Sequence, residues 1–309
     1  MNDLSNSTTV HTALSATEWR NPASTDLDQL SSLEILRLMN VADREAVDAA
    51  GAVIQPLSEL VDAALTHVRR GGRVHYFGAG TSGRLGILDA SEIPPTFGRS
   101  DTVIGHIAGG DAALRSATEG SEDSIAAGMK DASGLGPLDV AIGLAASGGT
   151  PYVRGALMEA RTQGALTALV TSNPDAPLAP LADYLVAANT GPEVLTGSTR
   201  LKAGTAEKFV LNGFSTALMV GLGLTYSNLM VSASATNAKL RDRSVRILME
   251  ATGIERDVAA ERLTAADGDL KLAIVSSLGF VPLSDAAAAL GAAEGSVRGA
   301  LATLENPQS

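Results

Sequence analysis

The stretch VHYFGAGTSGRLGILDA, residues 74–90, reads as a buried strand, a glycine turn and the start of a helix. Its central part, GAGTSG (78–83), has the spacing G-x-G-x-x-G, which in dinucleotide-binding folds joins a strand to the N-terminus of a helix. The pattern predicts a strand over 73–77 and a helix over 82–90. It also raises the question of which phosphate-bearing ligand the turn holds.

Strand and helix patterns alternate around this unit. Apolar residues at helical spacing predict one helix from Leu30 and a second across 53–68. DVAIGLAA (139–146) is apolar on both faces, as a central parallel strand is. Further strands are expected at 102–107, 165–172 and 183–189. After Gly191 the pattern is helical, with one or two helices over 200–228 and others at 236–251, 255–265, 268–278 and 282–304, the last broken at Gly291. The sequence therefore predicts an α/β fold, with a parallel sheet covered on both faces and a helical tail.

Composition excludes several classes of function. The 309 residues carry a net charge of −11, with 23 basic against 34 acidic side chains, so no basic face for nucleic acid is expected. There is no cysteine, and the four histidines have no metal-ligand spacing, so we expect neither a thiolate nucleophile nor a metal site.

Neither a signal peptide nor a membrane span is expected. The first 20 residues have no apolar core, and the uncharged stretch 209–238 has an unbroken apolar run only over 217–224. That run is well short of the roughly 20 residues that a spanning helix needs. We therefore expect a cytoplasmic protein that does not bind a membrane.

The glycine turn lacks the second half of the dinucleotide fingerprint. A dinucleotide fold places an acidic residue at the end of the second strand, whereas that strand here ends IGHIAGG and Asp101 lies at its start. A second loop, SGGTP (147–151), follows strand 139–146 in the same way, with Pro151 suited to a first helical turn. Two such loops offer hydroxyls and backbone N–H groups to one phosphate dianion. We favour a sugar phosphate over NAD, the alternative being that both loops are only tight turns.

Two carboxylates are expected in opposite electrostatic surroundings. Pro94 and Pro95 are expected to end the helix that GAGTSG opens, which would place Glu92 in its last turn, where the helix dipole and burial favour a protonated acid. In EGSEDS (119–124), Ser121 is expected to cap a helix, which would place Glu122 in the first turn as a carboxylate. The pattern predicts an acid and a base, although both can equally be ordinary helix-end residues.

Cations of this acidic chain gather in TGSTRLKAGTAEK, residues 196–208. Thr196 or Ser198 can cap a helix there, and Lys202 can reach a ligand anion. The alternative is an amphipathic helix start with solvated lysines.

Six stretches in order resemble the N-acetylmuramic acid 6-phosphate etherases, a branch of the sugar isomerase (SIS) superfamily, and the resemblance covers nearly the whole chain. They are TEWRNPASTDLDQLSSLEIL (17–36), GAGTSGRLGILDASEIPPTFG (78–98), AGGDAALRSATEGSEDS (108–124), AASGGTPYV (145–153), GPEVLTGSTRLKAGTAEK (191–208) and NLMVSASATNAKL (228–240). The second loop of the family more often reads Ala-Ser-Gly-Arg-Thr-Pro, so Gly149 removes a cation near the phosphate.

This resemblance implies an SIS-type parallel sheet sandwiched by helices, with an N-terminal arm and helix (1–52), a sugar-phosphate-binding domain (53–228) and a C-terminal helical region (229–309). It implies a lyase that cleaves the D-lactyl ether of N-acetylmuramic acid 6-phosphate, giving N-acetylglucosamine 6-phosphate and D-lactate. The C2 proton is removed, lactate leaves C3 and water adds there. No metal or redox cofactor is needed.

The resemblance also implies roles for single residues. Glu92 would be the acid on the departing lactate and Glu122 the base at C2, with Glu119 as the rival base. The implied phosphate ligands are Thr81, Ser82, Ser147, Gly148 and Thr150, and Ser198 and Lys202 are implied near the phosphate or the lactyl carboxylate. The resemblance further implies a homodimer with active sites near the subunit interface. The arm residues Glu18, Arg20 and Asn21 are therefore expected to reach the site of the neighbouring subunit.

Two other functions stay open on the sequence. A sugar phosphate isomerase of the same superfamily would use similar loops without releasing lactate. A non-catalytic sugar-phosphate sensor, like the animal glucokinase regulatory protein, would bind a hexose phosphate without turnover. The stretch 252–280 resembles a ubiquitin-associated three-helix unit, for which a packing or dimer-stabilising role is expected.

Overall fold

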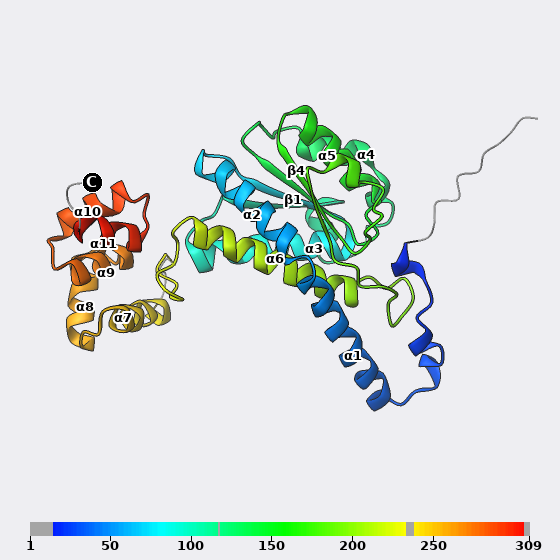
Figure 1. The fold of residues 1–309 in the computed structure, drawn as a ribbon, viewed down its shortest axis with the longest axis horizontal. Coiled ribbons are helices and arrows are strands. Elements are labelled where there is room, and N and C mark those ends of the chain that lie inside the picture. The colour runs from blue at the N-terminus through cyan, green and yellow to red at the C-terminus, as the bar shows by residue number, and fades with distance from the viewer. Residues whose placement is uncertain (1–14, 117, 233–237, 306–309) are drawn as a thin grey trace, which may run out of the picture.

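The computed structural model describes residues 15–116, 118–232 and 238–305. Residues 1–14 lie outside the described residues. The start of the predicted arm and most of the segment in which no signal peptide is expected fall in this range. At the centre is a parallel five-stranded sheet in the order β2-β1-β3-β4-β5 (Figure 1). The strands are β1 (Val74–Gly78), β2 (Val103–Ile107), β3 (Val140–Leu144), β4 (Leu166–Thr171) and β5 (Tyr184–Ala187). The predicted α/β fold and parallel sheet are confirmed.

Helices cover both faces of this sheet because successive strand residues point to opposite sides. Val74 and Tyr76 of β1 join one core, while Phe77 joins the other. The first core includes residues of α1 (Ser32–Gly51), α2 (Ile54–Arg69), α3 (Gly80–Phe97) and α6 (Lys202–Gly221). The second core includes residues of α4 (Ile125–Ala132) and α5 (Pro151–Thr162).

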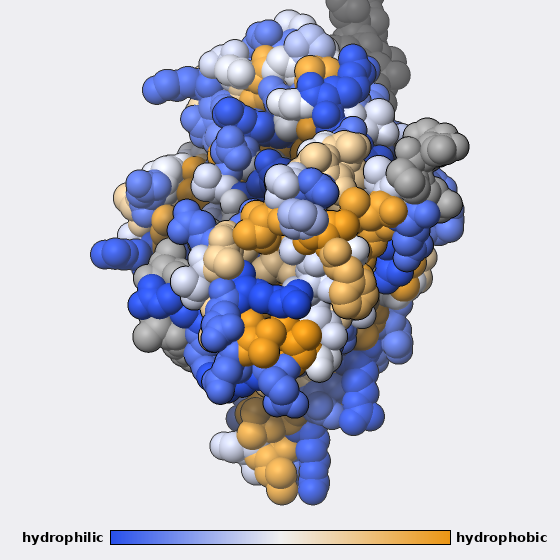
Figure 2. All heavy atoms as spheres, turned by 90° about the vertical axis from the view of Figure 1, so that its left-hand side faces the viewer, coloured by the Kyte–Doolittle hydropathy of each residue, from blue (hydrophilic) through white to orange (hydrophobic). Residues whose placement is uncertain are grey.

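The C-terminal helices form a third core of their own. They are α7 (Ala238–Thr252), α8 (Arg256–Ala265), α9 (Leu270–Gly279), α10 (Leu283–Ala292) and α11 (Val297–Glu305). Lys271 Nζ donates to the carbonyls of Gly223 and Gly295, at 3.0 and 2.8 Å, and so joins this region to the end of α6. Figure 2 shows this end of the molecule, where apolar side chains form patches on a largely hydrophilic surface. The predicted domain division at 52/53 and 228/229 stays a prediction.

None of the described helices is by itself long and apolar enough to cross a membrane. Only α9 and α10 taken together have the length and composition, and their axes are bent by 108° to one another.

The predicted end of α3 is wrong. The helix continues through Pro94 and Pro95 to Phe97 and ends at Gly98, which is left-handed (φ 67°) and donates its N–H to the Pro94 carbonyl. Two prolines remove two N–H donors from the helix, but Ile93 and Phe97, one turn apart, are buried in the first core. Burial of two large apolar side chains outweighs the lost hydrogen bonds. Glu92 therefore lies inside the helix, and it is exposed.

The predicted cap of α4 is also wrong. Ser121 begins a short 3-10 turn, Ser121–Asp123, and the cap is Ser124, whose Oγ accepts from the Ala127 N–H at 3.1 Å. Gly120 is left-handed (φ 72°) and turns the chain there. Glu122 consequently precedes α4 instead of lying in its first turn.

The structure settles the number of helices in 200–228 and moves the last helix break. The stretch 200–228 holds a single helix, α6, followed by a turn with an isolated bridge between Tyr226 and Leu229. The last break falls between α10 and α11, over 293–296, and not at Gly291.

Helices α4 and α5 pack backbone to backbone through two glycines. A Cβ on Gly155 would lie 2.0 Å from the Ile125 carbonyl oxygen, and one on Gly128 would lie 1.9 Å from that of Tyr152. We expect Gly155→Ala to lower the free energy of unfolding by about 1–3 kcal/mol or more, because a rigid backbone must move. Gly51→Ala is the matched control. It meets no heavy atom within 4 Å, so stability should stay equal or rise by up to ~1 kcal/mol. Denaturant unfolding measures both variants, and equal stability of the two would contradict this packing.

Candidate active site

The two predicted phosphate loops lie side by side at the carboxyl edge of the sheet. Strands β1 and β3 are parallel neighbours, with Gly78 opposite Leu144, so the loops that follow them leave the same edge. The order β2-β1-β3 makes this the point where the strand order reverses, which is where open α/β sheets bind ligands. The first loop opens α3 and the second opens α5.

Both loops have backbone conformations that suit glycine. Gly80 and Gly148 are left-handed, with φ of 55° and 71°, and a Cβ on Gly148 would lie 2.3 Å from that of Ala176. Pro151 is the first residue of α5, as predicted, and Thr150 is its N-cap residue. The hydroxyl-bearing residues Ser147 and Thr150 are half-buried. The loops thus gather hydroxyls and free N–H groups at the N-termini of two helices, an arrangement that binds a phosphate.

In the first loop, the hydroxyl of Ser82 contacts a residue that the sequence did not single out. Ser82 Oγ donates to Glu207 Oε2 of α6 at 2.6 Å, and both residues are buried. Burial raises the pKa of Glu207 to about 7, against the lowering effect of the Ser82 hydrogen bond. Thr81, the neighbouring predicted ligand, lies against α6, since a Cβ on Gly204 would be 3.6 Å from its methyl group.

The segment before α6 is organised by a buried glutamate. Glu193 is fully buried, and its carboxylate accepts the backbone N–H groups of Lys202 and Ala203 at 2.8 and 3.0 Å. Glu193 thus caps α6, in place of the expected Thr196 or Ser198. Lys202 is 3% exposed, and its ammonium donates to Glu45 Oε2 of α1 at 2.7 Å. In this chain Lys202 is therefore paired and does not face the phosphate loops with a free ammonium.

Glu122 belongs to the loop that leaves the same edge after β2. The loop starts at Ala108, whose N–H donates to the Gly78 carbonyl at 3.0 Å, beside the first phosphate loop. The 3-10 turn that holds Glu122 packs against α5, the helix of the second phosphate loop. Glu119 and Glu122 are both exposed. The loop therefore brings two carboxylates to the edge where the phosphate loops lie.

Glu92 lies at the other end of α3. It follows Gly80 by twelve residues, which is about 18 Å along a helix. Helices α3 and α6 run side by side in the same direction, because Ser82 contacts Glu207 and, further on, Ser215 Oγ donates to Asp89 Oδ1 at 2.9 Å. Glu92 therefore lies far along α3 from the N-terminus of this helix, where the first phosphate loop is.

Glu92 lines a depression of about 590 Å³ between the far ends of α3 and α6. Asp89 lies in the same depression and accepts from Tyr76 Oη at 3.0 Å and from Ser215. Burial raises the pKa of Asp89 to about 6, against the lowering effect of these hydrogen bonds. None of the residues that line this depression belongs to a phosphate loop.

The N-terminal arm lies against its own chain. Asn21 Nδ2 donates to the Pro192 carbonyl at 3.4 Å, and a Cβ on Gly197 would lie 3.2 Å from Glu18 Oε2. Glu18 and Asn21 thus contact the segment that precedes α6 in their own chain. The expectation that Glu18, Arg20 and Asn21 reach a neighbouring site stays a prediction. In the described ranges, no group of three or more metal-binding side chains is gathered in one place.

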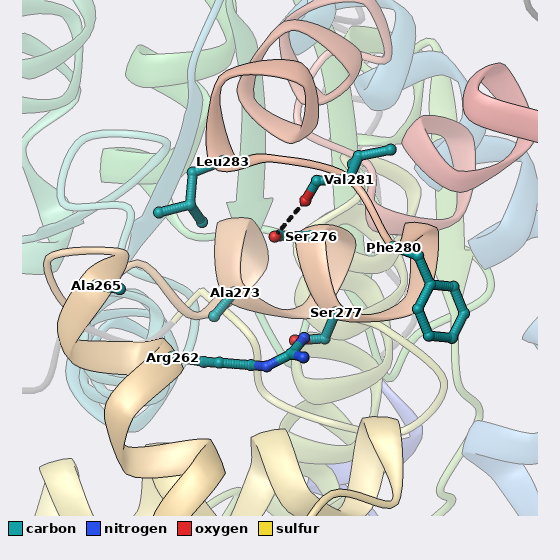
Figure 3. A pocket seen from close by; sticks show the side chains of 8 residues that line it. All are labelled: Arg262, Ala265, Ala273, Ser276, Ser277, Phe280, Val281 and Leu283. Atoms are coloured by element: carbon teal, nitrogen blue, oxygen red, sulfur yellow. Dashed lines mark hydrogen bonds between the residues drawn. The ribbon is translucent and has the colours of Figure 1, made fainter.

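A separate pocket of about 360 Å³ lies within the C-terminal helices (Figure 3). The Arg262 side chain extends along one side, Phe280 lies at the edge, and Ser276 Oγ donates to the Val281 carbonyl at 2.7 Å. The pocket contains none of the predicted site residues.

Known proteins are similar to this chain both in one domain and along most of its length. Residues 56–161, which hold both phosphate loops and Glu122, match the family model "Glucokinase regulatory protein N-terminal SIS domain". The N-acetylmuramic acid 6-phosphate etherase of Thermobifida fusca is 53% identical over 85% of this chain and 86% of its own. That of Pectobacterium atrosepticum is 50% identical over 92% and 95%. Among solved structures, a phosphoheptose isomerase from Francisella tularensis is 16% identical, with a TM-score of 0.47 over 61% of this chain and 98% of that one.

Proposed function

The chain belongs to the N-acetylmuramic acid 6-phosphate etherase family, and from this premise we propose how its residues carry the reaction. It is an enzyme, a carbon–oxygen lyase that cleaves the D-lactyl ether of N-acetylmuramic acid 6-phosphate to N-acetylglucosamine 6-phosphate and D-lactate. The observation that carries the residue assignment is the pairing of two hydroxyl-bearing loops at the β1/β3 edge.

The phosphate group is bound at these two loops. Thr81, Ser82, Ser147 and Thr150 supply hydroxyls, and Gly148 supplies backbone in a left-handed conformation where a Cβ would clash with Ala176. Two helix N-termini add positive potential in a chain with a net charge of −11. Ser198 and Lys202 remain proposed ligands for the phosphate or the lactyl carboxylate, for which Lys202 would have to leave Glu45.

Glu122 is the base at C2, and Glu119 is the alternative on the same loop. In the ring-opened sugar the aldehyde acidifies the C2 proton, which Glu122 accepts. The electron pair of the C2–H bond forms the C2–C3 double bond as the C3–O bond breaks. Water then adds at C3 and a proton returns to C2. Each positioned proton transfer contributes about 10²- to 10⁴-fold in rate.

Glu92 is the acid that protonates the departing lactate oxygen, and it acts on the site of a second copy. Its distance of about 18 Å from the loops of its own chain exceeds the span of one sugar. If the α3 helices of two copies pack antiparallel, Glu92 of the partner subunit lies beside the first phosphate loop. Exposed apolar residues near Glu92 support such a contact, namely Leu88, one turn earlier on α3, and Val220, which lines the same depression.

We propose accordingly that the protein is a homodimer with shared sites. A cytoplasmic location without membrane or nucleic-acid partners belongs to the same proposal. The isomerase and sensor alternatives have weaker support, because relatives named as etherases align along 85–92% of the chain.

Incubation with N-acetylmuramic acid 6-phosphate in H₂¹⁸O tests the function. We expect free D-lactate, together with ¹⁸O at C3 of N-acetylglucosamine 6-phosphate, because water replaces lactate at that carbon. Label found in lactate instead would contradict elimination at C2–C3. Intact substrate that is nevertheless bound would favour the sensor.

A further inference from the structure

The carboxyl group of Glu207 lies directly beneath the first phosphate loop. One of its oxygens, Oε2, is 2.6 Å from Ser82 Oγ, while the other, Oε1, is buried and has no hydrogen-bond partner among the described residues. Glu207 is 6% exposed, and Ser82 is 9% exposed. A buried carboxylate with an unpaired oxygen is costly, and a neutral carboxyl group in the same place costs much less.

Among the residues that the structure describes, no cationic side chain forms an ion pair with Glu207. The small cavity that it lines is otherwise bounded by uncharged residues, namely Ala146, Val170, Thr171, Ser172, Ala188 and Val210. Burial raises the pKa of Glu207 to about 7, against the lowering effect of the Ser82 hydrogen bond, so both protonation states are populated near neutral pH.

Several charged groups on the elements that pack against α6 are engaged with other partners. On α1, Glu45 pairs with Lys202, and Asp43 lies 3.4 Å from the Thr205 hydroxyl. On α3, Asp89 binds Tyr76 and Ser215, and Arg84 donates to the carbonyls of Leu114 and Ser116. Strand β4 has no ionisable residue. The ionisable residues of α2 are Glu59, Asp62, His67 and Arg69. Arg69 donates to the Gly221 carbonyl at the far end of α6, and His67 contacts the Leu138 carbonyl.

Ser82 cannot serve two acceptors at once. A serine hydroxyl has a single proton to donate, and here it is donated to Glu207. A phosphate dianion offers only acceptor oxygens. While Glu207 is ionised, these oxygens would face the lone pairs of Ser82 Oγ, and the negative charge of Glu207 would lie behind the hydroxyl. When Glu207 is protonated, its own O–H donates to Ser82 Oγ across the same 2.6 Å, and the serine proton is free for the phosphate.

We propose that Glu207 is a positioning residue for sugar-phosphate binding: it takes up one proton from solvent when the phosphate binds and thereby turns the Ser82 hydroxyl toward the ligand. The inference rests on the proposed placement of the phosphate at Ser82. Above pH 7 the proton must be acquired on binding, so affinity should fall by up to tenfold per pH unit. Glu207→Gln, which always has an N–H to donate to Ser82, should bind with an affinity that does not depend on this proton.

Calorimetry with N-acetylglucosamine 6-phosphate tests the proposal, because the ligand is already a dianion at pH 8. Titrations at pH 8 in two buffers of different ionisation enthalpy give the number of protons taken up. We expect the wild type to take up close to one proton per ligand bound and Glu207→Gln to take up close to none. Between pH 7 and 9 the wild-type Kd should rise, while that of the variant stays level.

The control Ser82→Ala separates this inference from the proposed phosphate site. If Ser82→Ala weakens binding but the wild type takes up no proton, the phosphate site stands and the role of Glu207 is overturned. If Ser82→Ala binds as tightly as the wild type, the phosphate is not at Ser82 and the inference falls with it. Proton uptake that persists in Glu207→Gln would assign the proton to another group and would likewise overturn the proposal.

Discussion

Glu122→Gln is expected to lower kcat by about 10²- to 10⁴-fold, the usual contribution of a positioned general base. The amide cannot accept the C2 proton, while the phosphate loops are unchanged, so the Kd for N-acetylglucosamine 6-phosphate should stay within about twofold. Exchange of the C2 proton with D₂O, followed by NMR, should be lost together with lactate release. Exchange reports proton removal directly and does not depend on later steps.

Glu119→Gln is the matched control, because it removes a carboxylate from the same exposed loop. We expect its kcat and C2 exchange to stay near those of the wild type. If Glu119→Gln abolishes exchange and Glu122→Gln does not, the base is Glu119 and the assignment is reversed.

Glu92→Gln is expected to lower kcat by a similar factor of about 10² to 10⁴ for a different reason. The base is intact in this variant, so C2 exchange into bound substrate should continue while lactate release is slow. This split between exchange and release distinguishes loss of the acid from loss of the base. The neighbouring variant Ser91→Ala removes only a hydroxyl that donates to the Leu88 carbonyl, and its kcat should be unchanged. Loss of exchange in Glu92→Gln would contradict the role of leaving-group acid.

The sheet and its loops could be predicted from the sequence because their signals are local. A strand, a glycine turn and a helix start occupy consecutive residues around 74–90, and the loop at 147–151 repeats them. The long-range arrangement has no such signal. Lys202 pairs with Glu45 across 157 residues, and Ser82 meets Glu207 across 125. Nothing in the stretch TAEK distinguishes a buried glutamate from the solvated one that a helix usually carries.

The errors at α3 and α4 came from local rules that tertiary contacts outweighed. Pro94 and Pro95 normally stop a helix, but the buried Ile93 and Phe97 hold this one in place. The error had a consequence for the site. A helix that runs from Gly80 to Phe97 places Glu92 about 18 Å along its axis from Gly80, which is too far for Glu92 to act at the first phosphate loop of its own chain.

In the proposed dimer each active site holds Glu122 of one subunit and Glu92 of the other. Co-expression of Glu92→Gln with Glu122→Gln tests this arrangement most directly. Random pairing makes about half of the dimers mixed, and in each mixed dimer one of the two shared sites keeps both glutamates. Two nearly inactive variants should thus recover about a quarter of the wild-type kcat per dimer. Activity no higher than that of the separate variants, in a preparation shown to contain mixed dimers, would contradict a site built from two copies of the chain.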